Sequence, residues 1–301
     1  MKASVAAVVV LFNPDLVVLD RLLLSISEQV QFVYVVDNTP GAGIENYQGR
    51  FDDENLFYHA LQDNYGIARA HNVGVQLAEK AGYSHVLLLD QDSELSPGTV
   101  ETLLVEEQKL LDAGVKVGAI GPVFIDEKTG DAAPALKPSF LGTKSVEIDL
   151  SSTLPVMSNY IIASGSLIRI SVFNVVGLMQ ESLFIDWVDI EWGERASSVG
   201  YGSYLTPLVT MRHSIGDEFV TLLGKRITLH SDFRNYFIVR NATYLALWSK
   251  IRFQTRFRFA RKIPYYVVCY TLCSQKKLYS AKLLCLAFYD GVVRNMFKGR
   301  F

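Results

Sequence analysis

Short apolar runs alternate with amphipathic stretches through the first 125 residues of the chain. The runs have the length and composition of strands that are buried on both faces of a parallel sheet, and they cover residues 5–11, 32–36, 86–89 and 117–123. Apolar residues at helical spacing predict a helix over residues 16–27. A second helix is expected to run on to about residue 81, and a third to cover about residues 97–113. This alternation predicts an α/β protein with a doubly wound, mainly parallel sheet flanked by helices.

Polar side chains follow two of the predicted strands at the point where each strand ends. Asp37-Asn38 comes after one strand, and Asp90-Gln91-Asp92 comes after another. The carboxyl ends of parallel strands meet at one edge of the sheet, where α/β proteins bind their ligands. Asp90 and Asp92, together with the oxygens of a diphosphate, would supply most of the ligands of a hard divalent cation. The plainer alternative is a strand that ends in an acidic turn, because Asp-x-Asp is common by chance.

A second polar segment lies between these strand ends, at residues 63–74. It contains Asn64-Tyr65-Gly66 and Asn72-Val73-Gly74, and it opens the helix that is expected to run on to about residue 81. A helix N-terminus offers free amide groups and the positive end of the helix dipole to a phosphate. The segment therefore favours a phosphate-binding turn, although the same glycines would also suit an ordinary helix cap with close packing.

Beyond residue 125 the regular alternation weakens. Residues 126–154 have the composition of loops with an edge strand. Ala163-Ser164-Gly165-Ser166 forms a tight turn of small residues, which lets the backbone approach a ligand closely. The stretch from Arg234 to Asn241 begins a long helix whose arginines suit an anionic substrate or an ordinary solvated face.

Three acids lie among large apolar residues at positions 184–192. At helical spacing Asp186 and Asp189 share one face, whereas Glu191 points elsewhere. A carboxyl group in apolar surroundings binds its proton more tightly, which suits a general base. The alternative is a helix start with stabilising acids and one ion-pair partner, Arg195.

The C-terminal residues differ in charge from the rest of the chain. Residues 250–301 hold twelve Lys and Arg and one acid, Asp290, whereas the first 249 residues hold the other 17 basic residues and 30 acids. Basic residues mixed with aromatic ones are typical of a segment that lies on an anionic membrane surface. The alternative is that this tail packs on the rest of the chain or on a second copy, as a homodimer interface, with its charges solvated. No recognisable nucleic-acid-binding fold surrounds the tail, so nucleic acid is not expected as a partner.

Composition also bears on where the protein works. No run reaches the about 18–20 apolar residues that span a bilayer, and residues 3–12 lack the cleavage site of a secretion signal. The three cysteines have neither zinc-binding spacing nor an even-numbered disulfide pattern, which favours a reducing compartment. We expect a cytoplasmic protein that is attached peripherally to the inner face of the plasma membrane through its tail.

Taken together, these segments resemble the glycosyltransferase family 2 enzymes of the GT-A fold, from Val5 to about Asn241. The markers occur in the family's order: Leu11-Phe12-Asn13-Pro14, Asp37-Asn38, Asn64-Tyr65-Gly66, Asn72-Val73-Gly74, Asp90-Gln91-Asp92, Ser164-Gly165-Ser166, Asp189-Ile190-Glu191, His213 and Arg240-Asn241. Residues 184–192 look most like those of bacterial rhamnosyltransferases that use dTDP-L-rhamnose. The resemblance implies a Rossmann-like GT-A domain with a C-terminal helical extension. Its expected parts are a nucleotide-sugar half at about 1–125, an acceptor half at about 126–249, and the basic amphipathic tail at 250–301.

The resemblance also implies roles for individual residues. Asp189 would be the catalytic base and Asp37 would read the pyrimidine base. Asp90 would bind the ribose or the metal, and Asp92 and His213 would hold Mg²⁺ or Mn²⁺ on the diphosphate. Further contacts to the nucleotide-sugar would come from Asn13, Asn38, Asn64, Gly66, Asn72 and Gln91. The candidates on the acceptor side are Ser164, Gly165, Asp186, Trp187, Glu191, Arg240 and Asn241.

One position departs from the family pattern. Val188 precedes Asp189, where many family members have Glu, which leaves open whether Asp186 compensates.

The function that this resemblance implies is inverting, metal-dependent sugar transfer. L-Rhamnose would pass from dTDP-L-rhamnose to a hydroxyl group of a growing, lipid-linked bacterial surface polysaccharide, with a metal on the leaving diphosphate and a carboxylate as base. One alternative is a transferase of the same fold that uses another nucleotide-sugar. A metal-dependent nucleotidyltransferase or pyrophosphatase is a second alternative, but it gives Asp189 no role. A third is a non-catalytic membrane adaptor that relies on the tail.

Overall fold

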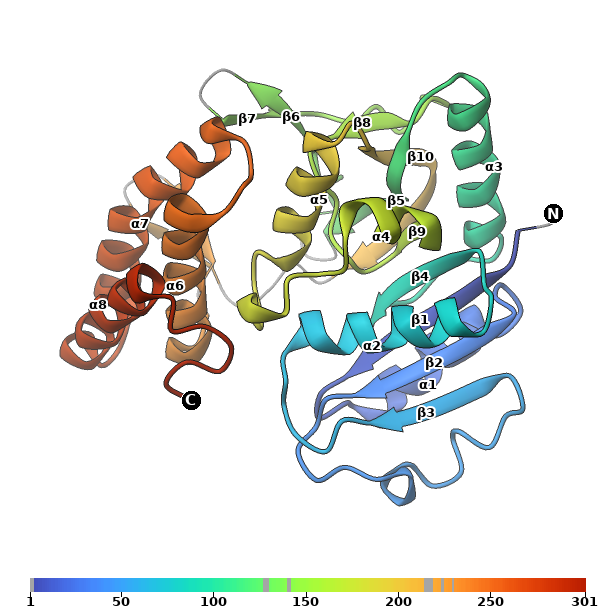
Figure 1. The fold of residues 1–301 in the computed structure, drawn as a ribbon, viewed down its shortest axis with the longest axis horizontal. Helices are drawn as coiled ribbons and strands as arrows, with labels where there is room; N and C mark the ends of the chain where they lie inside the picture. The colour runs from blue at the N-terminus through green and yellow to red at the C-terminus, as the bar shows by residue number, and fades with distance from the viewer. Residues whose placement is uncertain (1–2, 127–129, 140–141, 214–218, 223–224, 229) are drawn as a thin grey trace.

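The computed structural model describes residues 3–126, 130–139, 142–213, 219–222, 225–228 and 230–301. The described chain is built on an eight-stranded sheet (Figure 1). In spatial order its strands are β3 (Leu56–Ala60), β2 (Phe32–Asp37), β1 (Val5–Leu11), β4 (His85–Asp90), β9 (Ser166–Arg169), β5 (Val117–Asp126), β10 (Gly202–His213) and β8 (Val156–Ser158). The neighbours from β3 to β4 pair in parallel, as do β5 and β10, whereas β9 and β8 run antiparallel to their neighbours. The prediction of a mainly parallel α/β sheet is confirmed.

Helices cover the sheet on both sides. In the view of Figure 1, α2 (Ile67–Lys80) lies in front of the parallel strands and α1 (Leu16–Ile26) lies behind them. The other half carries α3 (Thr99–Asp112), α4 (Ile170–Val176) and α5 (Val188–Ser198), and two short 3₁₀ helices, η1 (Ile44–Tyr47) and η2 (Glu181–Leu183), lie in connections. This two-sided cover explains why the central strands β1, β2 and β4 carry continuous apolar runs.

Two hairpins lie outside the main sheet. β6 (Ala135–Ser139) pairs with β7 (Gly142–Val146), and β11 (Phe219–Leu222) pairs with β12 (Lys225–Thr228). The first hairpin falls in residues 126–154, where we expected loops and an edge strand, so that part of the expectation was incomplete. Its two strands are short and bordered by polar residues, which weakens the alternating pattern that identifies a strand.

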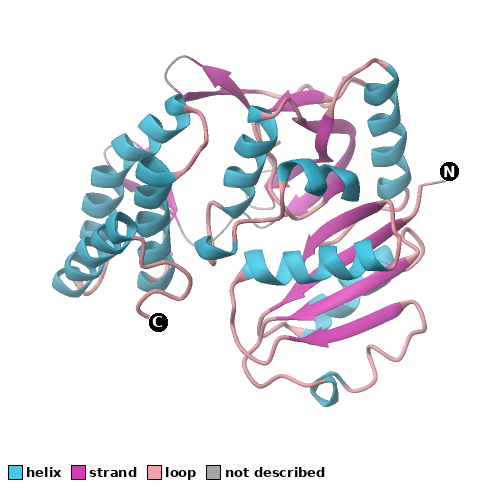
Figure 2. Ribbon diagram, in the orientation of Figure 1, coloured by secondary structure: helices cyan, strands magenta, loops and turns pink. Residues whose placement is uncertain are grey.

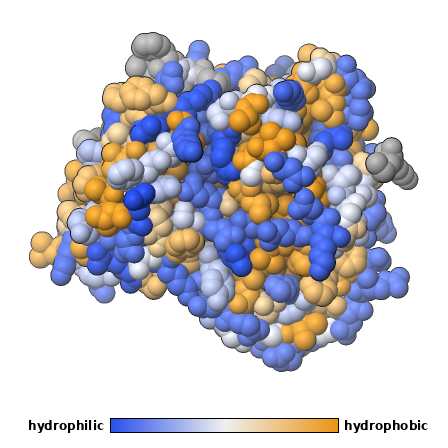
Figure 3. All heavy atoms as spheres, viewed as in Figure 1, coloured by the Kyte–Doolittle hydropathy of each residue, from blue (hydrophilic) through white to orange (hydrophobic). Residues whose placement is uncertain are grey.

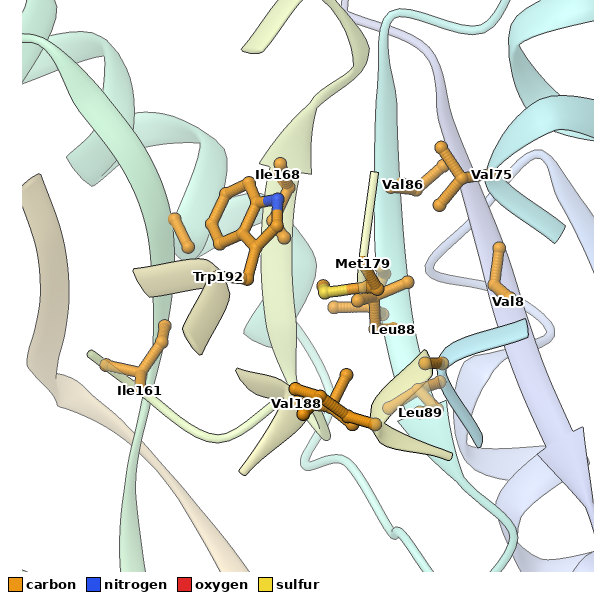
Figure 4. Packing of buried hydrophobic residues seen from close by; sticks show 14 of the residues in the cluster. Val8, Val75, Val86, Leu88, Leu89, Ile161, Ile168, Met179, Val188 and Trp192 are labelled. Atoms are coloured by element: carbon orange, nitrogen blue, oxygen red, sulfur yellow. The ribbon is translucent and has the colours of Figure 1, made fainter. Parts of the chain in front are cut away.

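One large apolar core joins the two halves of the sheet. Every residue of β1 is buried, and residues 86–89 of β4 are 0% exposed. Figure 4 shows Val8 on one side of β4 and Trp192 of α5 on the other, within one cluster of buried residues. Gly74 allows α2 to pack closely on β1, because a Cβ at this position would lie 2.2 Å from Cγ1 of Val8. This glycine therefore has a packing role.

The tail predicted at residues 250–301 folds largely as two helices, α7 (Phe253–Cys273) and α8 (Lys277–Val293). They form a bundle with α6 (Asp232–Trp248) beside the sheet, as Figures 1 and 2 show. Arg252 ties this bundle to α5 through an ion pair with Glu194 at 3.0 Å, and the Thr255 hydroxyl donates to Glu194 at 2.7 Å. The tail thus packs on the rest of the chain. Among the helices that the structure describes, none is long and apolar enough to cross a membrane.

Candidate active site

The carboxyl ends of β1, β2 and β4 meet at one edge of the sheet. In the register of the strands, Asp37 lies beside Leu11 and Asp90 lies beside Val10, so both predicted carboxylates reach the same edge. This placement follows from parallel pairing, which brings the ends of the strands together even though they are far apart in the sequence. We call this part of the molecule the nucleotide edge, after its expected ligand.

Two of the predicted contact residues hold the loops of the nucleotide edge in place. The Gln91 side chain accepts a hydrogen bond from the Phe12 amide at 2.7 Å and donates to the Phe12 carbonyl at 3.2 Å. The Asn13 amide donates to the Thr39 hydroxyl at 2.8 Å, and Asn13 adopts a positive φ of 46°. Asn tolerates this left-handed conformation better than most residues, which gives a local reason for its presence.

Asp37 is fully buried and already well bonded. Its carboxylate accepts hydrogen bonds from the Thr39 amide at 2.9 Å, from the Tyr58 hydroxyl at 2.8 Å and from the Tyr47 hydroxyl. Burial and the Asp37 charge raise the pKa of both tyrosines above the usual range. In this structure Asp37 therefore organises the wall of the nucleotide edge, and its role in reading a base stays a prediction.

The polar segment before α2 forms a tight turn. Asn38 donates to the Asn64 side-chain oxygen at 2.8 Å, and the Gly66 amide donates to the same oxygen at 3.0 Å. Gly66 has a φ of +85°, and a Cβ there would lie 2.4 Å from the Phe184 carbonyl oxygen. Only glycine fits at this contact, which joins the turn to the loop before α5. Asn72 points away from the edge, since its amide donates to the Met179 carbonyl at 2.9 Å.

Asp90 is the last residue of β4, and Asp92 lies on the turn that follows it. Asp90 is half-buried, and burial together with the negative charge of Asp92 raises its pKa to about 6, while Arg234 acts in the opposite direction. Asp92 is exposed. The predicted acceptor-side turn braces these acids from behind, because the Ser164 hydroxyl accepts from the Asp90 amide at 3.4 Å and the Gly165 amide donates to the Leu88 carbonyl at 2.8 Å.

The loop before α5 is strained. Phe184, Asp186 and Trp187 all adopt positive φ angles, between 61° and 67°, which large side chains rarely occupy. Such strain persists only where the surrounding structure enforces it, and it is typical of functional sites. Arg240 and Asn241 enforce it from behind the loop, through the hydrogen bonds described next.

Arg240 and Asn241 are fully buried on α6. The Asn241 amide donates to the carbonyls of Leu183 and Ile185, both at 2.8 Å, and Arg240 donates to the Leu183 carbonyl at 3.0 Å. Burial lowers the pKa of Arg240 to about 10, so it stays charged at neutral pH. We expected both residues to face an acceptor, but the structure places them inside the protein, where they position the loop.

Asp189 is the second residue of α5 and is half-buried. Its Oδ1 accepts a hydrogen bond from the Ile190 amide at 2.8 Å. Burial is the main cause that raises its pKa to about 6, and the negative charges of Asp90 and Asp186 add to the effect. A carboxylate with this pKa is ionised at neutral pH and is close to the ideal proton affinity of a general base.

The two other acids of this segment have ion-pair partners. Asp186 accepts from Nε of Arg234 at 3.0 Å. Glu191 faces the opposite side of α5, as the helical spacing predicts, and pairs with Arg195 at 2.9 Å. Arg195 thus neutralises Glu191. Asp189, in contrast, lines the cleft that is described below.

A cleft of about 1010 Å³ joins these elements. Four of the predicted residues line it: Asp90, Asp186, Trp187 and Asp189. Its remaining polar walls come from residues that the sequence did not single out, namely His71, His230, Arg234, Arg261, Lys262, Tyr265, Tyr266 and Tyr270. The last five belong to α7, so the tail completes the cleft.

His71 of α2 is the most unusual of these wall residues. It is 1% exposed, and neither ring nitrogen has a hydrogen-bond partner within the described residues. Burial lowers its pKa to about 4, so the ring is neutral at pH 7. A buried polar group without a partner is costly, which is typical of a group that meets a ligand. Its place five residues after Gly66, on the helix that opens at the nucleotide edge, was the available signal.

Asp90 and Asp92 suit a hard divalent cation, because both offer carboxylate oxygens and their mutual repulsion favours a positive charge nearby. The third predicted ligand, His213, ends β10, and its side chain lies outside the described part of the structure. Within the described residues, no three His, Cys, Asp or Glu side chains gather into a ready-made metal site. The two aspartates therefore fit a metal that takes further ligands from a diphosphate.

Comparisons with known proteins agree with this geometry. No protein-family model matches the chain. The chain is 33% identical over 245 residues to dTDP-rhamnosyl transferase RfbF of Shigella flexneri, which covers 81% of this chain and 80% of that protein. An uncharacterized protein of Mycobacterium tuberculosis is 29% identical over 162 residues, about half of each chain.

Two solved structures share the fold. The crystal structure of GalNAc-T7 with UDP, GalNAc and Mn²⁺ has a TM-score of 0.59 at 16% identity, over 91% of this chain and 58% of that one. S. aureus TarS has a TM-score of 0.54 at 16% identity, over 96% of this chain and 49% of that one. This chain thus spans about half the length of either.

The fold is that of a GT-A glycosyltransferase. The chain belongs to the glycosyltransferase family that includes RfbF of Shigella flexneri, so the resemblance found in the sequence is confirmed. Membership of this family sets aside the nucleotidyltransferase, pyrophosphatase and adaptor alternatives. A nucleotide-sugar donor and a saccharide acceptor are its substrates.

Proposed function

We propose that the protein transfers L-rhamnose from dTDP-L-rhamnose to a hydroxyl group of a saccharide acceptor, with inversion at the sugar carbon. The identity with dTDP-rhamnosyl transferase RfbF supports the choice of donor. The observation that carries the mechanism is the placement of Asp189 in the same cleft as Asp90. A base and a diphosphate-binding group on one cleft are what a direct displacement needs.

Asp189 acts as the base in this proposal. Its carboxylate takes the proton of the acceptor hydroxyl while the acceptor oxygen forms a bond to C1 of the sugar. The bond between C1 and the diphosphate oxygen breaks, and its electron pair leaves with dTDP. With a pKa of about 6, Asp189 is ionised at neutral pH and can accept that proton.

Asp90 and Asp92 would hold Mg²⁺ or Mn²⁺, with His213 as the further predicted ligand. A bound divalent cation neutralises the charge that develops on the leaving diphosphate. The two aspartates bring the oxygen donors that both metals prefer. The GalNAc-T7 crystals contained Mn²⁺, which supports the general class of metal.

His71 suits a sugar hydroxyl rather than a phosphate. Its ring is neutral at pH 7, and each nitrogen is free to donate or accept a hydrogen bond. A neutral partner gains its full hydrogen-bond energy in a buried cleft without the cost of a buried charge. We assign it to the donor sugar because it lies on α2, beside the nucleotide edge.

A lipid-linked surface polysaccharide at the cytoplasmic face of the membrane is the proposed setting of the acceptor. The net positive charge of the tail supports attraction to anionic lipid. Phe253 and Leu278 are 73% and 90% exposed on α7 and α8. Figure 3 shows hydrophobic and hydrophilic side chains mixed over these helices, as on a surface that enters a headgroup layer.

A thermal-shift panel of nucleotide-sugars, followed by a transfer assay, tests this function. We expect dTDP-L-rhamnose with Mg²⁺ or Mn²⁺ to raise the unfolding temperature most, because a ligand stabilises the state it binds. Excess chelator should abolish both the shift and the transfer. Asp92→Ala should do the same, whereas Asp52→Ala, an exposed carboxylate in the loop before β3, should not.

Two results would overturn the proposal. A larger shift with another nucleotide-sugar would change the donor, and full transfer activity in excess chelator would remove the metal.

A further inference from the structure

α7 presents one side to the cleft. Lys262, Tyr266 and Tyr270 recur every four residues, and Arg261 and Tyr265 form the adjacent row. Side chains four apart on a helix stack above one another, so these five residues make one continuous wall. Such a wall carries two kinds of chemistry, aromatic rings and positive charges.

The aromatic part lies next to the catalytic loop. The rings of Tyr266 and Tyr270 stack almost in parallel, with 5.6 Å between centroids and 4° between planes. Trp187, two residues before Asp189, lies 6.2 Å from Tyr266 between ring centroids. Flat aromatic surfaces bind the apolar C–H faces of sugar rings, and they commonly line small-molecule clefts.

The positive part lies at the N-terminal end of the same wall. Arg261 and Lys262 are exposed, and neither forms an ion pair with any described residue. Partial burial and the nearby charges of Arg258 and Arg261 lower the pKa of Lys262. The positive charges of Arg261 and Lys262 therefore create a field that favours a bound anion.

The position of α7 separates it from the donor. The nucleotide edge is formed by the ends of β1, β2 and β4, and Figure 1 shows α5 between those strands and α7. Asp189 lies in the first turn of α5, so α7 lies on the far side of the base from the nucleotide edge. In a direct displacement the acceptor approaches from the side opposite to the leaving diphosphate.

We propose that α7 forms the acceptor subsite and that it selects a saccharide that carries a phosphate group. The sugar ring packs on Trp187, Tyr266 and Tyr270, and Arg261 and Lys262 hold the phosphate. The inference rests on the proposed function, because it takes Asp189 as the base between donor and acceptor. It gives the tail a role in substrate choice in addition to any contact with lipid.

The test compares hexoses with the matching hexose 1-phosphates in a binding titration with the full chain. Saturating dTDP and Mg²⁺ fill the donor side first, so that the phosphate cannot occupy it. We expect a hexose 1-phosphate to bind about tenfold or more tightly than its parent hexose, since charge-assisted bonds from two cations hold the phosphate. Arg261→Ala/Lys262→Ala should abolish that preference and leave the affinity for dTDP unchanged.

Lys276→Ala/Lys277→Ala is the matched control. It removes two exposed positive charges from the same tail, outside the cleft, and should keep the full preference for the phosphate. Tyr266→Ala should weaken the hexose and the hexose phosphate alike, because it removes part of the ring platform and leaves the charges.

Three results would overturn the inference. Equal affinity for hexoses and their phosphates in the unmodified protein would remove phosphate recognition. A loss of dTDP affinity in Arg261→Ala/Lys262→Ala would assign these cations to the donor. Equal hexose and hexose-phosphate binding, together with a selective loss of binding to phosphatidylglycerol vesicles in that variant, would assign them to a lipid headgroup.

A failure of the proposed function can be distinguished from a failure of this inference. The absence of dTDP binding in the unmodified protein contradicts the donor assignment, whereas the outcomes above concern α7 only when dTDP binds normally.

Discussion

Asp37 at the end of β2 and Asp189 at the start of α5 are both shielded carboxylates, but the protein surrounds them in opposite ways. Asp37 accepts hydrogen bonds from two tyrosine hydroxyls and a backbone amide, and its exposed fraction is 0%. Asp189 accepts a bond from the Ile190 amide and lies near two further negative charges, those of Asp90 and Asp186. One carboxylate is stabilised by its neighbours, and the other is held against their repulsion.

This difference separates the scaffold of the site from its reactive part. A carboxylate with all its bonds made contributes to folding and has little capacity left for chemistry. A carboxylate with a raised pKa costs stability, and proteins keep such groups mainly where function needs them. The strained φ angles at Phe184, Asp186 and Trp187 lie in the same loop, which adds a second cost at the same place.

The largest effect should follow from Asp189→Asn. The change keeps the shape of the side chain and removes the base, so we expect turnover to fall by ~10²–10⁴, the usual contribution of a positioned base. The affinity for the donor should stay within about threefold, because the nucleotide edge is untouched. Steady-state kinetics and a donor titration measure the two quantities.

Asp186→Asn is the matched control for that experiment. It makes the same chemical change three residues earlier, at a carboxylate that is paired with Arg234. We expect a smaller loss of turnover, within ~10-fold, because an ion pair of this exposure contributes modestly. The reverse ranking of the two variants would make Asp186 the base.

The sheet and the nucleotide edge could be predicted because they depend on local pattern. Continuous apolar runs mark the buried strands, and parallel pairing then determines where their ends meet. That is why Asp37 and Asp90 were expected at the same edge of the sheet. In the structure both lie beside the end of β1, Asp37 next to Leu11 and Asp90 next to Val10. The direction of Glu191 followed from the helical period in the same way.

The far wall of the cleft could not be predicted from local pattern. Tyr266 and Tyr270 lie about eighty residues after Trp187, and only the packing of α7 on α5 brings them together. The basic, aromatic composition of the tail indicated that it contacts another surface. It did not indicate whether that surface is a membrane, the rest of the chain or a second copy. Arg240 and Asn241 show the opposite difficulty, since their motif was recognised but their inward direction depends on the loop they hold.

Asp37→Asn should give the next largest effect, on stability. An amide cannot accept from all three donors and brings its own N–H groups against the tyrosine hydroxyls, so we expect a loss of ~2–4 kcal/mol in the free energy of unfolding. Urea unfolding without ligand measures it. Asp52→Asn, an exposed carboxylate on a neighbouring loop, should stay within ~0.5 kcal/mol. Unchanged stability together with lost dTDP binding would instead show that Asp37 binds the pyrimidine base of the nucleotide.

The smallest effect should come from Asp189→Asn measured as stability, and its sign should be opposite to that of Asp37→Asn. The pKa of Asp189 is about 6 in the folded protein, against ~3.9 in an unfolded chain. The stabilising contribution of a group with a raised pKa is complete below the unfolded value and is lost as the pH rises through the folded value. Asparagine does not ionise, so the variant should gain ~1–3 kcal/mol over the unmodified protein at pH 7.5. The gain in the free energy of unfolding should grow between pH 4 and pH 6 and stay constant above pH 6.

Glu191→Gln makes the same change in the same helix but breaks the ion pair with Arg195, so urea unfolding should show a loss of stability in that variant. A loss of stability in Asp189→Asn at pH 7.5 would contradict the view that this carboxylate is held at a cost.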